Sequence, residues 1–504
     1  MPFQILIIVF ITAAATFGYF MAPRDDNSVV GRIVTAWISV AAIAFFVPDK
    51  LLALIIIGIV LLAIGQLSAQ KRVYLYLATI IALPTSMSAF VPFPGINYLV
   101  ELDYLKICTL AVLGPAFMKA LSAKKSPALR NVDVLILTYI LYISVLAIRE
   151  VSFTSVLRQI FDQMIIVYIP YIVISRTLTT SEHMTTAIKM LFVGLLITLA
   201  IGLISTLRSW NFYAMLNDGP LGYKAFADYR NGFLRVAATT IPALTGYFMG
   251  VGIAISLTLN RLNQTPKSRT LLLTVLFAFI CFATGARGGW ISGSAVVILY
   301  FLFVRMSRSL RSLTTLGILG FIVGGLLMLQ QGNLDVTDQY GTFDYRAELI
   351  KTAFVQIGEY PLFGEANFIQ NPRFRHLIQG EGIVDIVNAY IGFALTYGLI
   401  GLILFLSANF ITVSRGLKTL ALMEKKPDQE NFSERRTIFC LLIAMQVSYL
   451  ILIATISTVS HIGILSFIIL ALLVANVRVE TANALQQTKS VMEANGAAPT
   501  AALP

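Results

Sequence analysis

Three arginines lie at the ends of apolar stretches or in the long polar segment between two of them, where a specific role can be asked of each cation. Arg235 begins one such stretch, Arg287 lies in the glycine-containing turn 284–290, and Arg346 lies in the long polar segment 334–387. A guanidinium can bind a phosphate or carboxylate group through two parallel hydrogen bonds. The glycines of the turn allow the backbone to approach a ligand closely. These residue types therefore predict a site for an anionic substrate group.

Each of these arginines also has an ordinary interpretation. Arg287 could reach towards lipid headgroups beside a tryptophan, and Arg235 could simply anchor the end of its span. Arg346 could pair with acids on an exposed helix, although such pairs contribute little to stability. Two further cations, Arg230 and Lys224, either add positive potential for binding a substrate or are solvated loop residues.

Residues that could move a proton lie at the end of the same polar segment. Asp385 could act as a base towards a sugar hydroxyl, or it could cap the helix that follows. His376 is the alternative base, although a lone histidine in a loop is commonly solvated. Asn388 could orient a sugar or form a hydrogen bond between helices.

Other kinds of chemistry lack their motifs. The chain has no GxxxxGK[ST] sequence for ATP and no Asp-x-Asp pair for a metal–nucleotide-sugar complex. The three cysteines lie in apolar stretches without a CxxC pair, and the three histidines lie far apart. The sequence therefore predicts an activity that needs no metal and no cofactor.

The composition indicates a membrane protein. The chain is 57% hydrophobic and only 12% charged, with a mean hydropathy of +0.81. Apolar runs close to the roughly 20 residues that cross a bilayer recur along it. We therefore predict an all-α fold, a polytopic transmembrane helical bundle of about 13–15 spans. The expected spans are 3–22, 30–47, 50–67, 72–90, 104–122, 132–149, 159–176, 185–208, 236–258, 270–285, 288–304, 312–330, 387–411, 437–459 and 461–477.

The basic residues predict how these spans are oriented. The net charge of +12 resides mostly in short loops that share one face if the spans alternate, and that face is expected to be cytoplasmic. Because topology accounts for this positive charge, we expect no nucleic-acid partner. The opposite, periplasmic face then carries the outer loop 209–235 and the large loop 331–386. Within the large loop, residues 343–357 have the apolar spacing of an amphipathic helix.

This topology divides the chain into four parts. Residues 1–330 hold the N-terminal transmembrane helices, with the run 3–20 as a retained first helix. Residues 331–386 form the large periplasmic loop, and 387–477 hold the C-terminal transmembrane helices. Residues 478–504 are polar and rich in small residues, which predicts a disordered cytoplasmic tail.

Three motifs in this order resemble the O-antigen ligase and polymerase superfamily. The turn 284–290 resembles that family's Thr-x-Ser-Arg-Gly turn, and Arg346 followed by Pro361 and Gly364 resembles its Arg…Pro-x-x-Gly loop. The segment 387–401 resembles its last motif, and Arg235 with Gly246 resembles an arginine–ten–glycine pattern of its polymerases. The specific motifs cover only about residues 235–401.

The resemblance implies a substrate and a reaction. Members bind undecaprenyl-diphosphate-linked glycans on the periplasmic side and transfer the glycan to a hydroxyl, which releases the carrier diphosphate without metal or nucleotide. By this resemblance Arg235, Arg287 and Arg346 would hold the diphosphate. The implied location is the bacterial inner membrane, where the implied partners are the lipid-linked oligosaccharide and the surrounding lipids, and a chain-length regulator is a protein partner that this interpretation allows.

The form of the last motif favours one branch of the superfamily. The family's usual His-Asn is Val387-Asn388 here, and residues 385–388 look more like exopolysaccharide polymerases of the xanthan or sphingan kind. We therefore expect a polymerase of lipid-linked repeat units. The alternatives are a ligase that transfers the glycan to lipid A core and, from another class, a transporter or flippase for lipid-linked sugars.

Overall fold

The computed structural model is that of an all-α polytopic membrane protein, as predicted. It describes residues 3–23, 27–83, 87–123, 128–150, 153–216, 228–230, 232–239, 241–306, 342–378, 384–425, 431–457 and 461–494, with the isolated positions 310, 313 and 317. Eleven of the described helices are long and apolar enough to cross a membrane, judged by length and composition. Apart from the isolated positions 313 and 317, the predicted span 312–330 lies outside the described residues, and so does the loop residue Lys224.

The helices of the first half are α1 (Phe3–Met21), α2 (Asn27–Phe46), α3 (Lys50–Ile64), α4 (Ala69–Ala82), α5 (Tyr104–Cys108), α6 (Gly114–Ser122), α7 (Arg130–Leu146), α8 (Phe153–Gln163), α9 (Ile169–Thr177) and α10 (Ser181–Arg208). Those of the second half are α12 (Pro242–Arg261), α13 (Lys267–Ala283), α14 (Arg287–Arg305), α16 (Thr342–Glu359), α17 (Ala389–Met423), α18 (Phe432–Ile453) and α19 (His461–Ala494). The antiparallel strands β1 (Ser88–Phe93) and β2 (Ile96–Asp103) form one hairpin, and β3 (Tyr229–Arg230) and β4 (Phe233–Leu234) form another.

The sequence-based count of 13–15 spans is higher than eleven because several predicted spans are shorter helices. The predicted span 72–90 contains most of α4, which has 14 residues, and its last three residues already belong to strand β1. At 1.5 Å per residue α4 is roughly 21 Å long, which is less than the ~30 Å hydrocarbon thickness. Helices α3 and α13, with 15 and 17 residues, are also short of a full span.

Two spans are continued through π-helical turns. One π-helix, Thr109–Leu113, joins α5 to α6, and another, Met164–Tyr168, joins α8 to α9. Each is followed by a helix with proline in its first turn, Pro115 or Pro170. Proline lacks the N–H group of the regular helical ladder, and a wider turn is one way to accommodate it without ending the helix.

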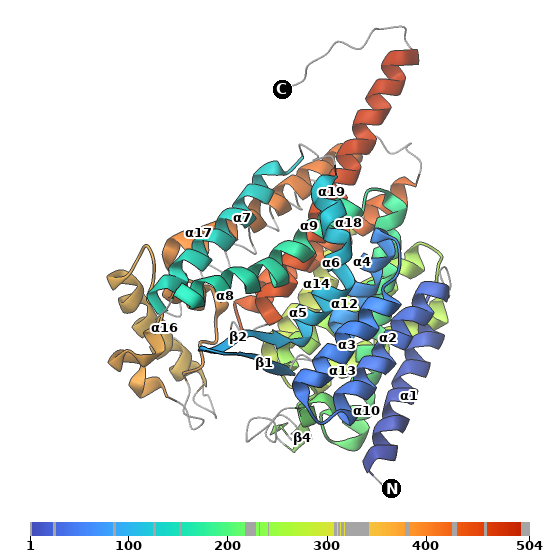
Figure 1. Cartoon of the computed structure of the whole chain (residues 1–504). Coiled ribbons are helices and arrows are strands. Elements are labelled where there is room, and N and C mark those ends of the chain that lie inside the picture. Colours follow the sequence, from blue (N-terminus) through green and yellow to red (C-terminus); the bar gives the residue numbers. More distant parts are fainter. Residues whose placement is uncertain are drawn as a thin grey trace.

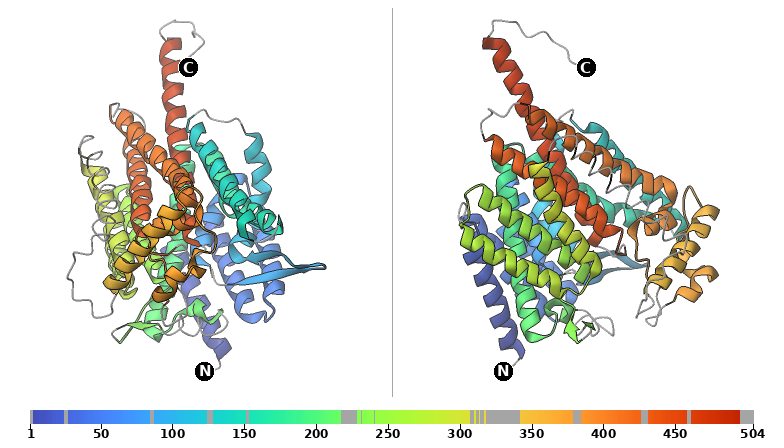
Figure 2. Two further views of the ribbon diagram at one scale, coloured as in Figure 1. Left: turned by 90° about the vertical axis from the view of Figure 1, so that its left-hand side faces the viewer. Right: turned by 180° about the vertical axis from the view of Figure 1, so that it is seen from behind.

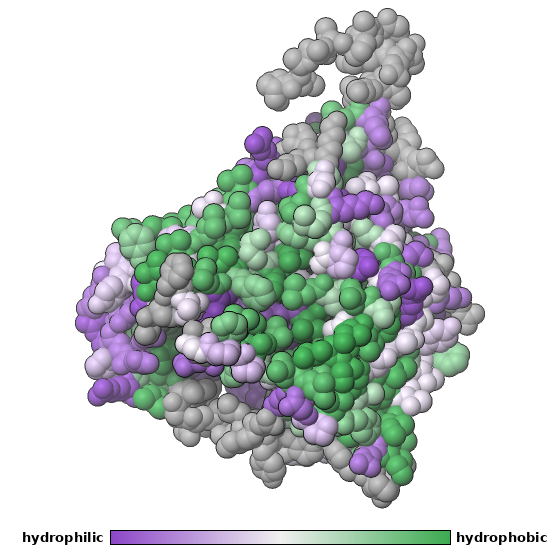
Figure 3. All heavy atoms as spheres, viewed as in Figure 1, coloured by the Kyte–Doolittle hydropathy of each residue, from purple (hydrophilic) through white to green (hydrophobic). Residues whose placement is uncertain are grey.

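The helices form one bundle with the polar segment at its edge. Helices α7 and α17 pack against each other on the side near α16, whereas α1 lies at the far edge (Figure 1). The right-hand view of Figure 2, from behind, shows the same separation of α1 from α16. Apolar residues cover most of the middle of the visible surface, and hydrophilic residues gather over α16 (Figure 3). This distribution fits a membrane-embedded bundle with α16 outside the apolar layer.

The two ends of the bundle differ. We call the end at which α6, α12 and α17 finish the basic end, because Lys119, Arg261 and Lys418 lie near it, and the end at which α14 begins and α18 finishes the pocket end. Helix α19 extends beyond the other helices at the basic end (Figure 1). By the bias of loop charges, the basic end would face the cytoplasm.

The prediction of disorder from residue 478 onward is wrong for residues 478–494, which continue α19. Two charged side chains hold this extension to the bundle. The buried Arg478 donates two hydrogen bonds of 2.8 Å to the carboxylate of Asp133, and the buried Glu480 pairs with Arg435. Polar composition alone predicted a solvated tail, but these ion pairs depend on partners far away in the sequence.

Glycines bring α12 and α14 into backbone contact at the pocket end. Gly246 and Gly250 on α12 face Gly289 and Gly293 on α14, so both helices carry the small-xxx-small spacing of closely packed membrane helices. A Cβ atom at Gly250 would lie 2.3 Å from the carbonyl oxygen of Gly293. Gly246, singled out in the sequence for its distance from Arg235, is therefore a packing residue.

Replacing Gly250 by alanine should consequently destabilise the bundle. An added methyl group in such a contact costs about 1–3 kcal/mol because the helices must move apart. We expect Gly250→Ala to lower the melting temperature measured by size-exclusion chromatography of heated, detergent-solubilised protein. Gly31→Ala is the matched control, since a Cβ atom there meets nothing within 4 Å. Equal melting temperatures for the two variants would contradict the packing role.

Candidate functional site

A cavity of about 360 Å³ opens at the pocket end, and four arginines from separate segments line it. Arg230 comes from β3, Arg235 from the segment before α12, Arg287 from the start of α14 and Arg346 from α16. The other lining residues are Ile241, Pro242, Ala243, Ala286, Gly288, Tyr345, Asp385, Val387, Thr455, Ile456 and Ser457. The structure thus brings together the three arginines that the sequence associated with one anionic group.

Arg235 is positioned through its backbone. Its carbonyl accepts a hydrogen bond of 3.0 Å from the side-chain amide of Asn211, whose oxygen accepts one of 2.9 Å from the N–H of Ala237. Its side chain passes over Gly285, where a Cβ atom would lie 3.3 Å from the Arg235 Cγ. Gly285 also has a φ of +58°, which favours glycine. The turn at Gly285 therefore leaves room for the arginine of another segment.

One carboxylate already neutralises part of the arginine charge. Asp228 accepts a hydrogen bond of 3.0 Å from Arg235, and both side chains are about one-third exposed, at 34% and 29%. The Nε of Arg235 is buried and has no hydrogen-bond partner among the described residues. An ion pair at this exposure is weak, so an incoming anion can compete with Asp228 for the guanidinium.

Arg287 is the first residue of α14, and the helix N-terminus contributes to the same cavity. The N-cap residue, Ala286, provides no side-chain hydrogen bond to the first turn. The N-terminus of a helix carries a partial positive charge and N–H groups that bind anions. Gly288, the next lining residue, faces Thr455: a Cβ atom there would lie 2.4 Å from the Thr455 Oγ1. Glycine thus allows the connection after α18 to approach α14.

Helix α16 presents Arg346 to the cavity, and its amphipathic character confirms the helix predicted in the large loop. Its apolar residues Leu349, Ile350 and Ala353 are buried in a small core with Phe374 and Leu395. This core attaches α16 to the N-terminal part of α17. The polar segment is therefore a folded unit that holds Arg346 at a defined place.

Tyr345, the neighbour of Arg346, connects α16 to Asp385. Its hydroxyl donates a hydrogen bond of 3.0 Å to the carbonyl of Asp385 and accepts one of 3.0 Å from the N–H of the same residue. Burial raises the pKa of the Tyr345 hydroxyl. The phenol therefore stays protonated at neutral pH and keeps both hydrogen bonds.

Asp385 also meets a residue from a distant part of the chain. Its Oδ1 accepts a hydrogen bond from the hydroxyl of Ser457, which follows α18. Its side chain lines the cavity together with the arginines. A carboxylate beside a cationic hollow is suited to accept a proton from a hydroxyl that reacts there.

Two predicted site residues lie elsewhere. Asn388 is only 6% exposed, and its Oδ1 accepts hydrogen bonds from the N–H groups of Tyr390 and Ile391, so it caps α17 and does not line the cavity. Asn388, rather than Asp385, is thus the capping residue. The Nε2 of His376 lies 3.5 Å from the Oε1 of Glu348, and the His376 side chain is 51% exposed. His376 is also absent from the cavity lining.

The Pro-x-x-Gly motif packs against a kink in α17. Gly398 has a φ of +69° within the helix, and a Cβ atom there would lie 2.1 Å from the carbonyl oxygen of Leu362. Arg149, in the short 3-10 helix Ala147–Glu150 after α7, donates hydrogen bonds to the carbonyls of Phe363, Gly364 and Thr396, at 2.7, 2.8 and 2.9 Å. This anchor fixes the turn that follows α16 to α17 and to the residues just after α7.

Arg149→Ala should therefore loosen the segment. The substitution removes all three charged hydrogen bonds, and the loss of even one, at about 1.5 kcal/mol, corresponds to roughly ten-fold more frequent local opening. We expect at least a roughly ten-fold faster chymotrypsin cleavage after the exposed Phe363 in membrane vesicles. Arg208→Ala, at an exposed position of the same end of the bundle, serves as the control. Identical cleavage rates would show that Arg149 does not anchor the segment.

Comparison with known proteins supports the same relationship as the motifs. Residues 272–406 match the family model described as O-Antigen ligase. A search of curated proteins found no match. The matched part runs from α13 into α17 and contains Arg287, Arg346 and Asp385, whereas Arg235 and Ser457 lie outside it. The match supports the O-antigen ligase and polymerase superfamily, and with it glycosyl transfer from lipid-linked saccharides by a multi-pass membrane protein.

Proposed function

We propose that this protein polymerises undecaprenyl-diphosphate-linked oligosaccharide repeat units on the periplasmic face of a bacterial inner membrane. The observation that carries the proposal is the convergence of four arginines, a helix N-terminus and one carboxylate in a single cavity at the pocket end. Positive charge at this end runs against the usual bias of loop charges, so a role in binding an anion accounts for it better than topology does.

In the proposed reaction, the growing chain on its lipid carrier is the donor. A hydroxyl of an incoming lipid-linked repeat unit attacks the anomeric carbon of the donor's first sugar. The bond between that carbon and the diphosphate oxygen breaks, and its electron pair leaves with the carrier diphosphate. Asp385 takes the proton of the attacking hydroxyl. In-line attack inverts the anomeric configuration, and the step needs no metal and no nucleotide.

The arginines act where negative charge develops. As the glycosidic bond breaks, charge increases on the bridging oxygen of the diphosphate. Arg287, Arg346 and the first turn of α14 are placed to stabilise it, because donors held in position before the reaction need little reorganisation during it. Arg235 and Arg230 extend the cationic lining, so that both phosphates can be held at once.

A ligase would use the same donor and differ in its acceptor. The family model carries the description O-Antigen ligase, which makes transfer to lipid A core the second candidate. The polymerase is favoured by the motif 385–388, in which Val387 stands where ligases have histidine. A chain-length regulator would be a protein partner of the polymerase.

A transporter for lipid-linked sugars is less well supported. Between the cavity at the pocket end and the basic end, a small cavity is lined only by apolar and aromatic residues, among them Tyr247, Phe248 and Met445. Alternating access places a polar binding site near the middle of the membrane. The arginine-lined cavity instead lies at one end.

Purified protein in vesicles tests the proposed function. Supplied with lipid-linked repeat units alone, it should form a ladder of longer saccharides and release undecaprenyl diphosphate. Product formation only after lipid A core is added would identify a ligase. Movement of intact lipid-linked units between leaflets without release of diphosphate would refute both the polymerase and the ligase function.

A further inference from the structure

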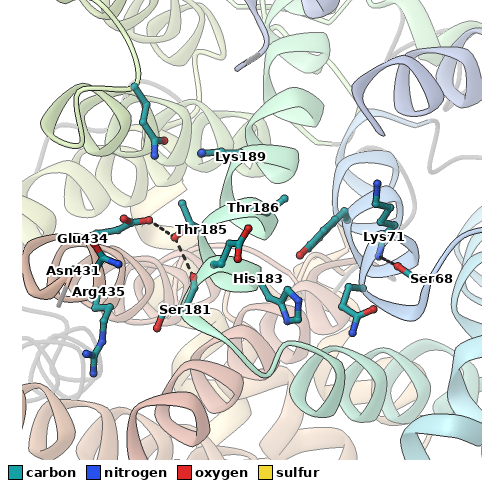
Figure 4. A pocket seen from close by; sticks show the side chains of 14 residues that line it. Ser68, Lys71, Ser181, His183, Thr185, Thr186, Lys189, Asn431, Glu434 and Arg435 are labelled. Carbon is teal, nitrogen blue, oxygen red and sulfur yellow. Dashed lines mark hydrogen bonds between the residues drawn. The ribbon is translucent and has the colours of Figure 1, made fainter. Parts of the chain in front are cut away.

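A second and larger polar cavity, of about 570 Å³, lies at the opposite, basic end. Its lining comes from the starts of α4, α10 and α18 and from Gln264, which follows α12. Figure 4 shows the α10 residues Ser181, His183 and Lys189 between Lys71 on one side and the α18 residues on the other. No part of the proposed reaction uses this cavity.

The cavity contains a cation that is costly to place there. Lys189 lies in the membrane-spanning helix α10 and is only 5% exposed. Ionisable residues within spans are rare and commonly mark a binding or transport site. Lys189 interacts electrostatically with Glu434, which also accepts a hydrogen bond of 2.6 Å from Thr185. The lining thus holds three cations, Lys71, Lys189 and Arg435, against two carboxylates, Glu182 and Glu434.

Other groups of the lining suit a ligand that carries both a negative charge and hydroxyl groups. Three helices begin at the cavity, and helix N-termini favour negative charge. The N-cap of α18, Asn431, gives its first turn no side-chain hydrogen bond. The Nδ1 of His183 and the Oε1 of Gln264 are buried without a hydrogen-bond partner among the described residues. Buried polar atoms of this kind call for a partner.

We propose that this cavity binds a phosphate ester, with Lys189 and Lys71 on the phosphate and the hydroxyl and amide side chains of the lining on the ester's polar body. The ester can come from two sources, the headgroup of a phospholipid or a soluble metabolite. The cavity volume suits a small ligand of this size. The inference does not depend on the proposed glycosyl transfer.

Thermal stabilisation of the detergent-solubilised protein tests the proposal. A ligand that binds only the folded state raises the melting temperature as its concentration exceeds the dissociation constant. The two probes are dihexanoyl-phosphatidylglycerol and glycerol 3-phosphate, which share the phosphoglycerol group. All measurements use an Arg287→Ala/Arg346→Ala background, so that the arginine-lined cavity does not contribute the signal.

We expect one or both probes to stabilise the protein, and the more effective one identifies the source. Lys189→Gln and Lys71→Gln should each weaken binding about ten- to a hundred-fold, because each removes a charged hydrogen bond. Lys71 is partly exposed, so its variant remains informative if the buried Lys189 variant does not fold. Lys418→Gln, an exposed lysine at the same end, is the control. No stabilisation by either probe, or a response of Lys71→Gln equal to that of the control, would overturn the proposal.

Discussion

Arg346→Ala is expected to abolish high-molecular-weight polymer and leave single repeat units in cells that contain normal amounts of the protein. Removing a group that stabilises developing negative charge lowers turnover by about 10²–10³-fold. Arg346 lies in the same cavity as Arg287, so Arg287→Ala should have a similar effect. Gel analysis of extracted saccharides, with protein levels checked by immunoblotting, measures the result.

Matched controls separate this effect from a general loss of charge. Lys351 and Arg375 are exposed cations of the same polar segment, and neither lines the cavity. Lys351→Ala and Arg375→Ala should therefore make polymer of normal length. Normal length in Arg346→Ala as well would remove that arginine from the reaction, and short chains in all three variants would indicate a nonspecific effect of charge.

The second large effect is expected at Asp385. Asp385→Asn keeps the size of the side chain but cannot accept a proton, and loss of a general base lowers turnover by about 10²–10⁴-fold. We expect the rate of diphosphate release by purified protein to fall by this factor, with a much smaller change in the apparent affinity for the donor. Single-turnover kinetics in detergent separate the two quantities.

His376→Ala discriminates between the two bases that the sequence offered. Because His376 is half-exposed and lies beside Glu348 outside the cavity, its removal should change the rate by less than about two-fold. Ser457→Ala should give an intermediate loss, since Asp385 would keep its place but lose one hydrogen bond. A large loss in His376→Ala with a normal rate in Asp385→Asn would reverse the assignment.

The sequence predicted the parts of the fold and site that depend on local patterns. Apolar runs revealed the membrane bundle, and the spacing of Leu349, Ile350 and their neighbours revealed α16. The turn with Arg287 and the loop with Arg346 could be recognised because glycines and prolines stand at fixed distances from each arginine. The convergence of these arginines follows from topology, since alternating spans bring their segments to one end.

Other features could not be predicted, because they depend on contacts between distant segments. Ser457 meets Asp385 across 72 residues of sequence, and nothing near Ser457 marks it as a site residue. Tyr345 looks like an ordinary aromatic residue until its hydroxyl is seen at the backbone of Asp385. Asn388 is a polar residue at the end of a span, which predicts contact with the substrate. Its side-chain oxygen instead accepts a hydrogen bond from the N–H of Tyr390 and caps α17.

The hairpin of β1 and β2 was missed for a different reason. The sequence of this region contains Pro92 and Pro94, which favour a loop, and its apolar first half resembles the end of a span. One side chain of α8 contacts the hairpin: the guanidinium of Arg158 lies 3.9 Å from the ring centre of Tyr98 and also donates hydrogen bonds to backbone carbonyls of β2.

The most direct test is to measure binding of undecaprenyl diphosphate and undecaprenyl monophosphate to the purified protein. If guanidinium groups converge on a pyrophosphate, the diphosphate should bind at least about ten-fold more tightly, and the preference should disappear in Arg287→Ala/Arg346→Ala. Equal affinity for the two lipids, or a preference that survives the double substitution, would contradict the account.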